Sequence, residues 1–348
     1  MRIGGTDLDE QVLVVAEIGN NHEGDLDVAK ALVVAAALAG ADAVKLQVYR
    51  ADRFANPNDA KRRARLEAWE LAPGAVAEIA RLARACGVAL VATPLDLASV
   101  TTLAPLVDAF KVASGDNDFL PLLDAIARTR KPVIVSSGMS TLATIEASAR
   151  RVRATWAELG HHGELAVLHC VSAYPAPEEE SGLAAIPLLQ RRLRCPIGWS
   201  DHTLGVDVCE LAVAAGARIV EKHVTLAHDF SDFRDHALSA EPDELAELVR
   251  RVRRVETVLG RPEKTIRPCE EETAALARRS IVAARDLQAG HVLTDADLTW
   301  MRPANGLRPG DEELVLGHAL VRPIGAGHPI LPSDVADAPG LREVTCAA

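Results

Sequence analysis

Short runs of Val, Ile, Leu and Ala alternate with longer amphipathic segments through the first three quarters of the chain. The short runs predict strands, at residues 11–18, 43–48, 88–92, 107–113, 132–136, 165–171, 196–199 and 217–224. The amphipathic segments predict helices, at residues 26–39, 74–86, 96–104, 119–129, 140–158, 182–193, 204–215 and 242–259. Eight β/α units that end near residue 260 indicate an α/β fold of the TIM (β/α)8 barrel type, which typically takes ~250 residues.

Polar residues at the ends of the predicted strands favour this barrel over a doubly wound sheet. The first strand is not followed by the glycine-rich turn that opens many dinucleotide-binding sheets. The strands end instead on polar residues, which are Glu17, Lys45, Gln47, Thr93, Lys111, Ser114, Ser136, His169, Ser172, Ser200, Asp201, His202, Glu221, Lys222 and His223. A barrel gathers these ends on one face, where the active sites of this fold lie. Because burying unpaired ionisable groups is costly, their recurrence at matching ends predicts a functional site.

The last quarter of the chain predicts a second, smaller domain. Residues 261–276 are mostly polar and start with a proline-containing stretch, which is typical of a linker. Residues 277–338 contain short apolar runs separated by glycine-containing turns, which predicts a compact domain of short strands. We therefore expect a catalytic barrel at 1–260, a linker at 261–276, a small domain at 277–338 and a frayed end.

Composition and charge narrow the class of protein. The net charge of −11 argues against nucleic acid or an anionic membrane as a partner. The six cysteines have no paired spacing, which favours reduced thiols in a cytoplasmic protein over disulfides or a zinc site. No apolar run is long enough to cross a bilayer. We expect a cytoplasmic location.

Two histidines at the ends of neighbouring strands predict a metal site. His202 ends the seventh strand and His223 ends the eighth, so the barrel brings both within reach of one cation. Imidazole pairs completed by water and substrate oxygens suit Mn²⁺, Fe²⁺, Co²⁺ or Zn²⁺. Either histidine alone would more often be a satisfied core residue. Together, beside the strand that ends in Glu17, they favour the metal site.

Two lysines on interior strands predict an anion pocket. Lys45 and Lys111 lie on the second and fourth strands, and Ser114 and Ser136 open short glycine-containing turns nearby. Backbone N–H groups in such turns, together with hydroxyls and lysines, suit phosphate. The alternative is an internal ion pair with a glutamate of the first or eighth strand. Two lysines and two turns favour a ligand with phosphate and carboxylate groups.

Eight short motifs now give the chain a family resemblance. They are AEIGNNHEGD, VKLQ, ATPLD, KVASG, SSGM, LHCVSAYP, WSDHTLG and EKH, in this order. Their order and spacing resemble those of the sialic acid synthase family, which includes the N-acetylneuraminate, legionaminate and pseudaminate synthases. The segment 279–306 resembles the C-terminal antifreeze-like SAF domain of that family. The resemblance covers essentially the whole chain and implies a TIM barrel followed by a SAF domain.

The resemblance also implies a reaction. Phosphoenolpyruvate would condense with an open-chain sugar aldehyde and release phosphate by C–O cleavage, giving a 2-keto-3-deoxy nonulosonic acid. His202 and His223 would hold a divalent metal, Mn²⁺ or Mg²⁺ with Co²⁺ as a further option, and Glu17 would assist the addition of water. Phosphoenolpyruvate would be bound by Lys45, Gln47, Thr93, Lys111, Ser114, Ser136 and Ser200. The sugar would be bound by Ser172, Tyr174, Asp235 and Arg302, the last reaching over from the partner subunit in a domain-swapped homodimer.

Four departures from the family pattern lie on the sugar side. Ser172 replaces the usual asparagine, Leu276 replaces an aromatic residue, and the segments 50–70 and 228–239 differ. The chemistry is therefore expected to be kept while the acceptor stays open. It is an N-acetylmannosamine-like sugar, another 2,4-diacetamido hexose, or an aldehyde of a natural-product pathway. Efficient use of N-acetylmannosamine would contradict a changed acceptor.

Two alternative functions remain at this point. A 3-deoxy-2-keto sugar-phosphate synthase would need an extra basic pocket, for which the charge run at 61–65 is the only candidate. We interpret that run as a solvated helix face. A non-catalytic sugar- or ice-binding protein would leave Glu17, the two lysines and the two histidines without a purpose.

Overall fold

The computed structural model describes residues 1–336, and the chain forms two compact units, Met1–Arg261 and Pro262–Ala348. The expected frayed end and the last two residues of the expected small domain lie outside the described residues. Within residues 1–336, no helix has the length and apolar character needed to cross a membrane.

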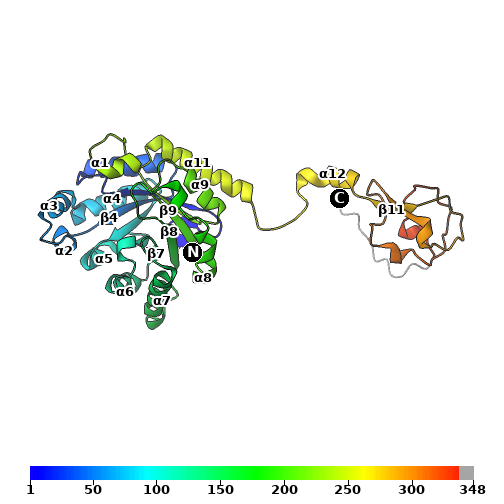
Figure 1. Cartoon of the computed structure of the whole chain (residues 1–348), viewed down its shortest axis with the longest axis horizontal. Coiled ribbons are helices and arrows are strands. Elements are labelled where there is room, and N and C mark those ends of the chain that lie inside the picture. Colours follow the sequence, from blue (N-terminus) through cyan, green and yellow to red (C-terminus); the bar gives the residue numbers. More distant parts are fainter. Residues whose placement is uncertain (337–348) are drawn as a thin grey trace. The chain divides into compact units, whose positions relative to one another are not determined.

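The first unit is a closed barrel of eight parallel strands, in the order β10-β3-β4-β5-β6-β7-β8-β9 (Figure 1). The strands are β3 Leu13–Gly19, β4 Ala43–Val48, β5 Ala89–Pro94, β6 Ala109–Val112, β7 Val133–Ser136, β8 Leu165–Cys170, β9 Ile197–Asp201 and β10 Ile219–His223. The main outer helices are α1 Leu26–Leu38, α4 Pro73–Ala85, α5 Leu97–Leu103, α6 Leu120–Arg128, α7 Leu142–Glu158, α8 Ala185–Leu193, α9 Asp207–Ala214 and α11 Pro242–Leu259. The predicted TIM barrel is confirmed.

Burial on both faces explains why the strands consist of continuous apolar runs. All seven residues of β3 are buried, because one face meets the barrel interior and the other meets the helices. The outer helices bury a single stripe, as α11 does with Leu245, Leu248 and Val252. The fold thus follows from the alternation of two-sided strands and one-sided helices.

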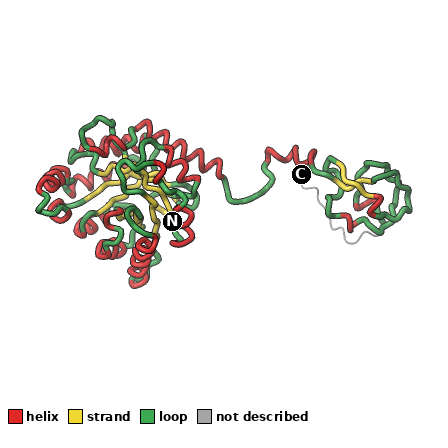
Figure 2. Tube along the Cα trace, in the orientation of Figure 1, coloured by secondary structure: helices red, strands yellow, loops and turns green. Residues whose placement is uncertain are grey.

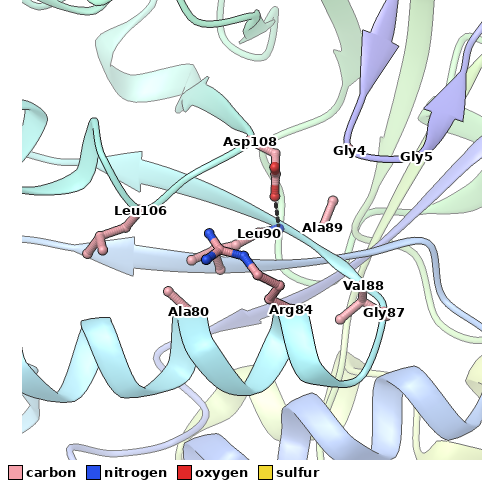
Figure 3. Close-up of a pocket in the computed structure, with 10 residues that line it drawn as sticks. All are labelled: Gly4, Gly5, Ala80, Arg84, Gly87, Val88, Ala89, Leu90, Leu106 and Asp108. Carbon is pink, nitrogen blue, oxygen red and sulfur yellow. Dashed lines mark hydrogen bonds between the residues drawn. The ribbon is translucent and has the colours of Figure 1, made fainter.

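An N-terminal hairpin that the pattern did not predict lies at the amino ends of the strands. Strands β1 Arg2–Ile3 and β2 Thr6–Asp7 pair antiparallel and are too short to show a period. Ile3 and Leu8 are fully buried in the interior cluster that includes Leu13 and Ile219. Between this hairpin and α4 lies a small cavity of about 220 Å³, where Asp108 accepts a hydrogen bond from the Leu90 amide at 2.8 Å (Figure 3).

Additional short elements follow four of the strands. They are α2 Ala51–Phe54 and α3 Ala60–Trp69 after β4, η1 Ser114–Asp116 after β6, η2 Glu178–Glu180 after β8 and α10 Arg234–Leu238 after β10. Tyr49, Ala51, Ala55 and Leu66 form a separate apolar cluster under α2 and α3. The charge run at 61–65 lies on α3, in agreement with its interpretation as a helix face, whereas α2 is a finding of the structure.

The second unit contains few regular elements (Figure 2). It comprises η3 Pro268–Glu270, α12 Glu271–Ala277, β11 Ser280–Ala283, η4 Asp295–Asp297, β12 Leu298–Met301, η5 Glu312–Leu314 and η6 Pro332–Asp334. Strands β11 and β12 pair antiparallel, and Ile281, Leu293, Val315 and Ile330 belong to its own core. The helix α12 lies within the segment expected to be a linker.

Candidate active site

The register of the parallel strands brings the predicted site residues side by side. Directly paired positions at the carboxyl ends are His223 with Glu17, Glu17 with Lys45, Gln47 with Thr93, and Glu221 with Ser200. A β-bulge follows Glu17, and Gly19 there has φ +54. A Cβ at Gly19 would be 3.1 Å from the Glu17 carboxylate. Glycine at this position therefore permits the positive φ angle and also leaves room for the carboxylate.

Side-chain alternation divides the strand-end residues into two sets. On β10, Glu221 contacts residues of other strands, whereas the next residue, Lys222, pairs with Asp201 at 2.7 Å and donates to the Thr203 carbonyl. Cys209 on helix α9 also bonds to Asp201, which places this ion pair between the barrel and its outer helices. The expectation that all strand-end polar groups face one site is therefore wrong for Asp201 and Lys222.

Inside the barrel, two lysines and two glutamates form one charge cluster. The Lys45 ammonium lies 3.1 Å from the Glu17 carboxylate and 2.9 Å from that of Glu221. Lys111 lies 3.6 Å from Glu221 and donates to the Ser136 hydroxyl at 2.6 Å. The internal ion pairs considered from the sequence are thus present. Glu221, which the sequence had not assigned to the site, contacts both lysines.

The two glutamates in this cluster have opposite protonation tendencies. Burial raises the pKa of Glu17 and outweighs the attraction of Lys45. Burial acts on Glu221 as well, but Lys111 and Lys45 together hold the pKa of that carboxyl well below its usual range. Burial also lowers the pKa of Lys111. Glu17 is consequently the carboxyl suited to proton exchange, while Glu221 stays ionised.

Hydroxyl and amide groups complete the lysine side of the site. Ser200 donates to Glu221 at 2.8 Å, and Gln47 donates to Glu17 at 2.9 Å. The Thr93 hydroxyl is buried and has no hydrogen-bond partner within the described residues. An unpaired buried hydroxyl is a position where a ligand oxygen could bind.

A glycine lets two further hydroxyls approach the turn after β7. A Cβ at Gly138 would be 2.7 Å from the Ser114 hydroxyl and would collide with that of Ser172. Ser114 also lies 3.2 Å from the Cys170 sulfur. Ser172 has a buried hydroxyl without a partner in the described part of the chain. The structure therefore places the hydroxyls of Ser114 and Ser172 at the turn after β7, the strand that ends in Ser136, which accepts the hydrogen bond of Lys111.

The two histidines have the properties of a ligand pair. Their ring centroids are 5.6 Å apart. His202 Nδ1 is 2.8 Å from the Val171 carbonyl, which fixes the ring and leaves Nε2 available. His223 Nδ1 is buried and has no partner among residues 1–336. Burial lowers the pKa of both rings, so both are neutral, as a metal ligand must be.

This pair would be the protein's whole contribution to such a centre. Within residues 1–336, no group of three or more His, Cys, Asp or Glu residues is arranged to hold a metal ion. The nearby glutamates are already engaged by lysines. The donor set nevertheless fits an open site in which water and substrate supply the other ligands.

A pocket of about 870 Å³ lies beside His223, and Gln47, Tyr174 and Asp235 are also among its lining residues. The Tyr174 ring lies 4.3 Å from that of His202. Burial raises the pKa of Asp235, whose carboxylate is 3.2 Å from Arg234. Three of the four residues expected to bind the sugar thus lie near the histidines or the Gly138 turn. The fourth belongs to the second unit.

The first sequence motif anchors the loop after β10, a role that the sequence did not reveal. Glu23 accepts a hydrogen bond from Ser231 and lies 3.0 Å from His236, both in that loop. Asn21 donates to Ser239 at 2.9 Å. Asp25, in the same motif, caps α1 by accepting hydrogen bonds from the Asp27 and Val28 amides. The signal for the anchoring role was the density of polar residues in both segments.

Fold and site together define a TIM-barrel enzyme with a separate C-terminal domain. The NeuB family matches residues 32–264, and the SAF domain matches residues 278–336. The chain belongs to the NeuB family, and it is an enzyme, a transferase of the sialic acid synthase type. The resemblance found in the sequence is confirmed.

Relatives of known name cover nearly the whole chain. An N,N'-diacetyllegionaminic acid synthase of Campylobacter jejuni is 35% identical over 322 residues, which cover 88% of this chain and 95% of the relative. The human N-acetylneuraminate-9-phosphate synthase is 35% identical over 300 residues, 82% of each chain. The crystal structure of the N-acetylneuraminic acid synthetase of Leptospira borgpetersenii superposes with a TM-score of 0.73 at 32% identity. It covers 78% of this chain and 94% of the other.

Proposed function

We propose that this enzyme condenses phosphoenolpyruvate with an open-chain sugar aldehyde to give a nonulosonic acid and inorganic phosphate. The observation that carries the proposal is the division of the site into two halves. Lysines and unpaired hydroxyls at one end suit a phosphorylated carboxylate, and neutral histidines beside a large pocket suit a polyhydroxy aldehyde. The names of the relatives, which make sialic, legionaminic and pseudaminic acids, support this reaction.

Phosphoenolpyruvate would bind by replacing contacts within the charge cluster. Lys45 and Lys111, now engaged with glutamates, would pair with its phosphate and carboxylate groups. The hydroxyls of Thr93, Ser114, Ser136 and Ser200, with Gln47, would supply neutral hydrogen bonds. Because Glu221 stays ionised between the two lysines, it holds them in place between turnovers.

A divalent cation, Mn²⁺ or Mg²⁺ with Co²⁺ as a further option, would be held by His202 and His223. When bound, it supplies Lewis-acid polarisation of the aldehyde oxygen. The Val171 carbonyl orients His202, and the Tyr174 ring packs against the same imidazole. These contacts would hold the His202 ring beside His223, which lines the acceptor pocket.

Glu17 would move the proton in this reaction. A bond forms between C3 of phosphoenolpyruvate and the aldehyde carbon, and water then adds at C2. Glu17 would accept one proton of that water at its carboxylate and return it to the oxygen of the former aldehyde. The C–O bond to phosphate then breaks, and the second proton of the water leaves with the phosphate. A buried carboxylate with a raised pKa is a stronger base than an exposed one, which suits this role.

The acceptor would be an N-acetylmannosamine-like sugar or a 2,4-diacetamido hexose, with a natural-product aldehyde as the alternative. Ser172, Tyr174 and Asp235 would contact it from the barrel. Arg302 would contact it from the SAF domain of the partner in a domain-swapped homodimer. Tyr174 and Asp235 line the pocket beside His223, which supports their part of this assignment.

The test is phosphate release from phosphoenolpyruvate with Mn²⁺ across a panel of acceptor sugars, with EDTA and Glu17→Gln as controls. The expected result is release with one acceptor that EDTA abolishes and that Glu17→Gln lowers by about 10²–10⁴-fold, with phosphoenolpyruvate affinity kept. Absence of phosphoenolpyruvate binding would overturn the proposal.

A further inference from the structure

Two arginines of α3 line the proposed acceptor pocket, which also includes His223. Arg62, Arg65 and Trp69 are three to four residues apart on one helix face with the buried Leu66, and all four line the pocket. The other cations of this charge run behave differently. Lys61 is exposed and does not line the pocket, and Arg63 pairs with Glu67 at 2.8 Å. The run lies on α3 and is mostly exposed to solvent, as interpreted from the sequence, and two of its arginines also line the pocket.

Both guanidinium groups are held in place but lack an anion. Arg62 lies 5.5 Å from the Phe54 ring centroid and Arg65 lies 5.3 Å from that of Trp69. Contact with a ring face orients a guanidinium and leaves its edge N–H groups free to donate. Among residues 1–336, neither arginine has a carboxylate within 4.0 Å, in contrast to Arg63 and Arg234.

The acidic residues of the same pocket are mostly engaged elsewhere. Glu23 is paired with His236, and Asp235 is paired with Arg234. Asp232, in the loop after β10, is exposed to solvent. The lysines of the charge cluster do not line this pocket. The positive charges of Arg62 and Arg65 thus remain without an anionic partner in the pocket that also includes His223.

We infer that the acceptor carries a phosphate monoester at the end remote from its aldehyde, and that Arg62 and Arg65 bind this group. The inference rests on the proposed function, because the pocket is the one assigned to the acceptor. Two oriented forks of N–H donors match the geometry of phosphate oxygens better than that of a neutral hydroxyl. Family membership does not decide this point.

The kinetic test compares matched acceptors that differ only at the remote end. The panel is N-acetylmannosamine, its 6-phosphate and the corresponding uronate, together with 2,4-diacetamido sugars, all assayed for phosphate release from phosphoenolpyruvate. The 6-phosphate is expected to have the highest kcat/KM. Arg62→Met and Arg65→Met should each raise its KM about 10- to 100-fold and leave the KM of phosphoenolpyruvate unchanged. Lys61→Met is the control and should change neither.

A binding measurement keeps the inference testable whichever sugar is the substrate. Because Arg65 stacks on Trp69, a phosphate bound there should change the fluorescence of Trp69, with Trp69→Phe as the blank. Hexosamine 6-phosphates are titrated against the unphosphorylated sugars at saturating phosphoenolpyruvate. The expected result is a saturable change with the phosphates alone, weakened about 10-fold or more in Arg65→Met.

The outcomes separate this inference from the proposed function. Equal kcat/KM for the neutral sugar and its 6-phosphate, in the parent and in Arg62→Met, would overturn the inference while the reaction stands. A preference for the uronate would overturn the assignment to phosphate. Absence of any phosphate-dependent change at Trp69 would overturn it even without turnover. Failure to bind phosphoenolpyruvate would instead refute the proposed function.

Discussion

At the scale of single residues, the site depends on the surroundings of each carboxylate and on the space beside one glycine. Glu17 and Glu221 share Lys45, yet their surroundings push their pKa values in opposite directions. The hydroxyls of Ser114 and Ser172 reach the turn after β7 because Gly138 has no side chain. Both arrangements depend on close contacts between side chains, so small substitutions should have large functional effects.

A one-carbon substitution tests the approach at the glycine turn. Gly138→Ala should raise the KM for phosphoenolpyruvate at least about 10-fold, because the added methyl group displaces the hydroxyls of Ser114 and Ser172. Gly115→Ala, at the residue that follows Ser114, is the control, since a Cβ there meets nothing within 4 Å. The KM for phosphoenolpyruvate is measured by steady-state kinetics. Equal values for the two variants would contradict the role of Gly138.

At the scale of elements, strand register and side-chain alternation separate functional from structural polar groups. Glu221 and Lys222 are neighbours on β10, but one joins the charge cluster and the other pairs with Asp201 outside the barrel. Glu23 fixes the loop after β10 to the first βα turn. The elements thus support the site through contacts that carry no chemistry themselves.

The buried pair outside the barrel is expected to affect stability more than catalysis. Lys222→Met leaves the Asp201 carboxylate buried without a counter-ion and should lower the free energy of unfolding by about 3–5 kcal/mol. Lys30→Met, which breaks an exposed pair with Glu78 at 2.8 Å, should cost at most about 1 kcal/mol. Urea unfolding followed by circular dichroism measures both. A smaller loss for Lys222→Met than for Lys30→Met would contradict this account.

A second element-scale prediction concerns the pH dependence of the SAF domain. Hydrogen bonds from His291, Thr294 and Arg285 hold the pKa of Asp297 well below its usual range. A depressed carboxyl pKa contributes stability above the unfolded value of 3.8, and this contribution is lost as the pH falls further. Hydrogen exchange of the β11–β12 hairpin in the full chain, corrected for intrinsic rates, should therefore lose protection below about pH 4.

Asp297→Asn supplies the control for this pH effect. The variant should lose protection of the same hairpin already at pH 7 and show a flatter dependence below pH 4, because the titrating group is gone. An unchanged slope in Asp297→Asn would assign the effect to another group.

At the scale of the whole molecule, the proposed site depends on a residue outside the barrel. Arg302 lies in the second unit, whose core is separate from that of the barrel. In a domain-swapped homodimer each site would combine the barrel of one subunit with the SAF domain of the other. Two chains that each lack a different part of the site would then form one intact site in a mixed dimer.

Mixing two inactive variants tests this arrangement. When Glu17→Gln and Arg302→Ala chains are unfolded and refolded together, mixed dimers should contain one intact site, restoring about a quarter of the parent activity. Each variant alone serves as the baseline. No gain on mixing, with mixed dimers shown by mass spectrometry, would contradict a site shared between subunits.

Much of the barrel could be predicted from the sequence because its signals are local. Each of the eight predicted strands overlaps a barrel strand, since two-sided burial requires a continuous apolar run. The motif residues at the strand ends could likewise be listed, because parallel strands end on the same face. The two-residue strands β1 and β2 gave no such signal, and the four-residue helix α2 is too short to show a helical period.

The tertiary structure alone decided which polar groups act together. Nothing local distinguishes Glu221 from Lys222, and only closure of the barrel turns one toward Lys45 and the other toward Asp201. Arg62 and Arg65 resemble their solvated neighbours in sequence until α3 brings them to the acceptor pocket. The sequence by itself determined the fold class and the family, since these depend on periodicity and motifs, and it named the candidate site residues. The partners of each charge depend on contacts between distant segments, which only the folded chain specifies.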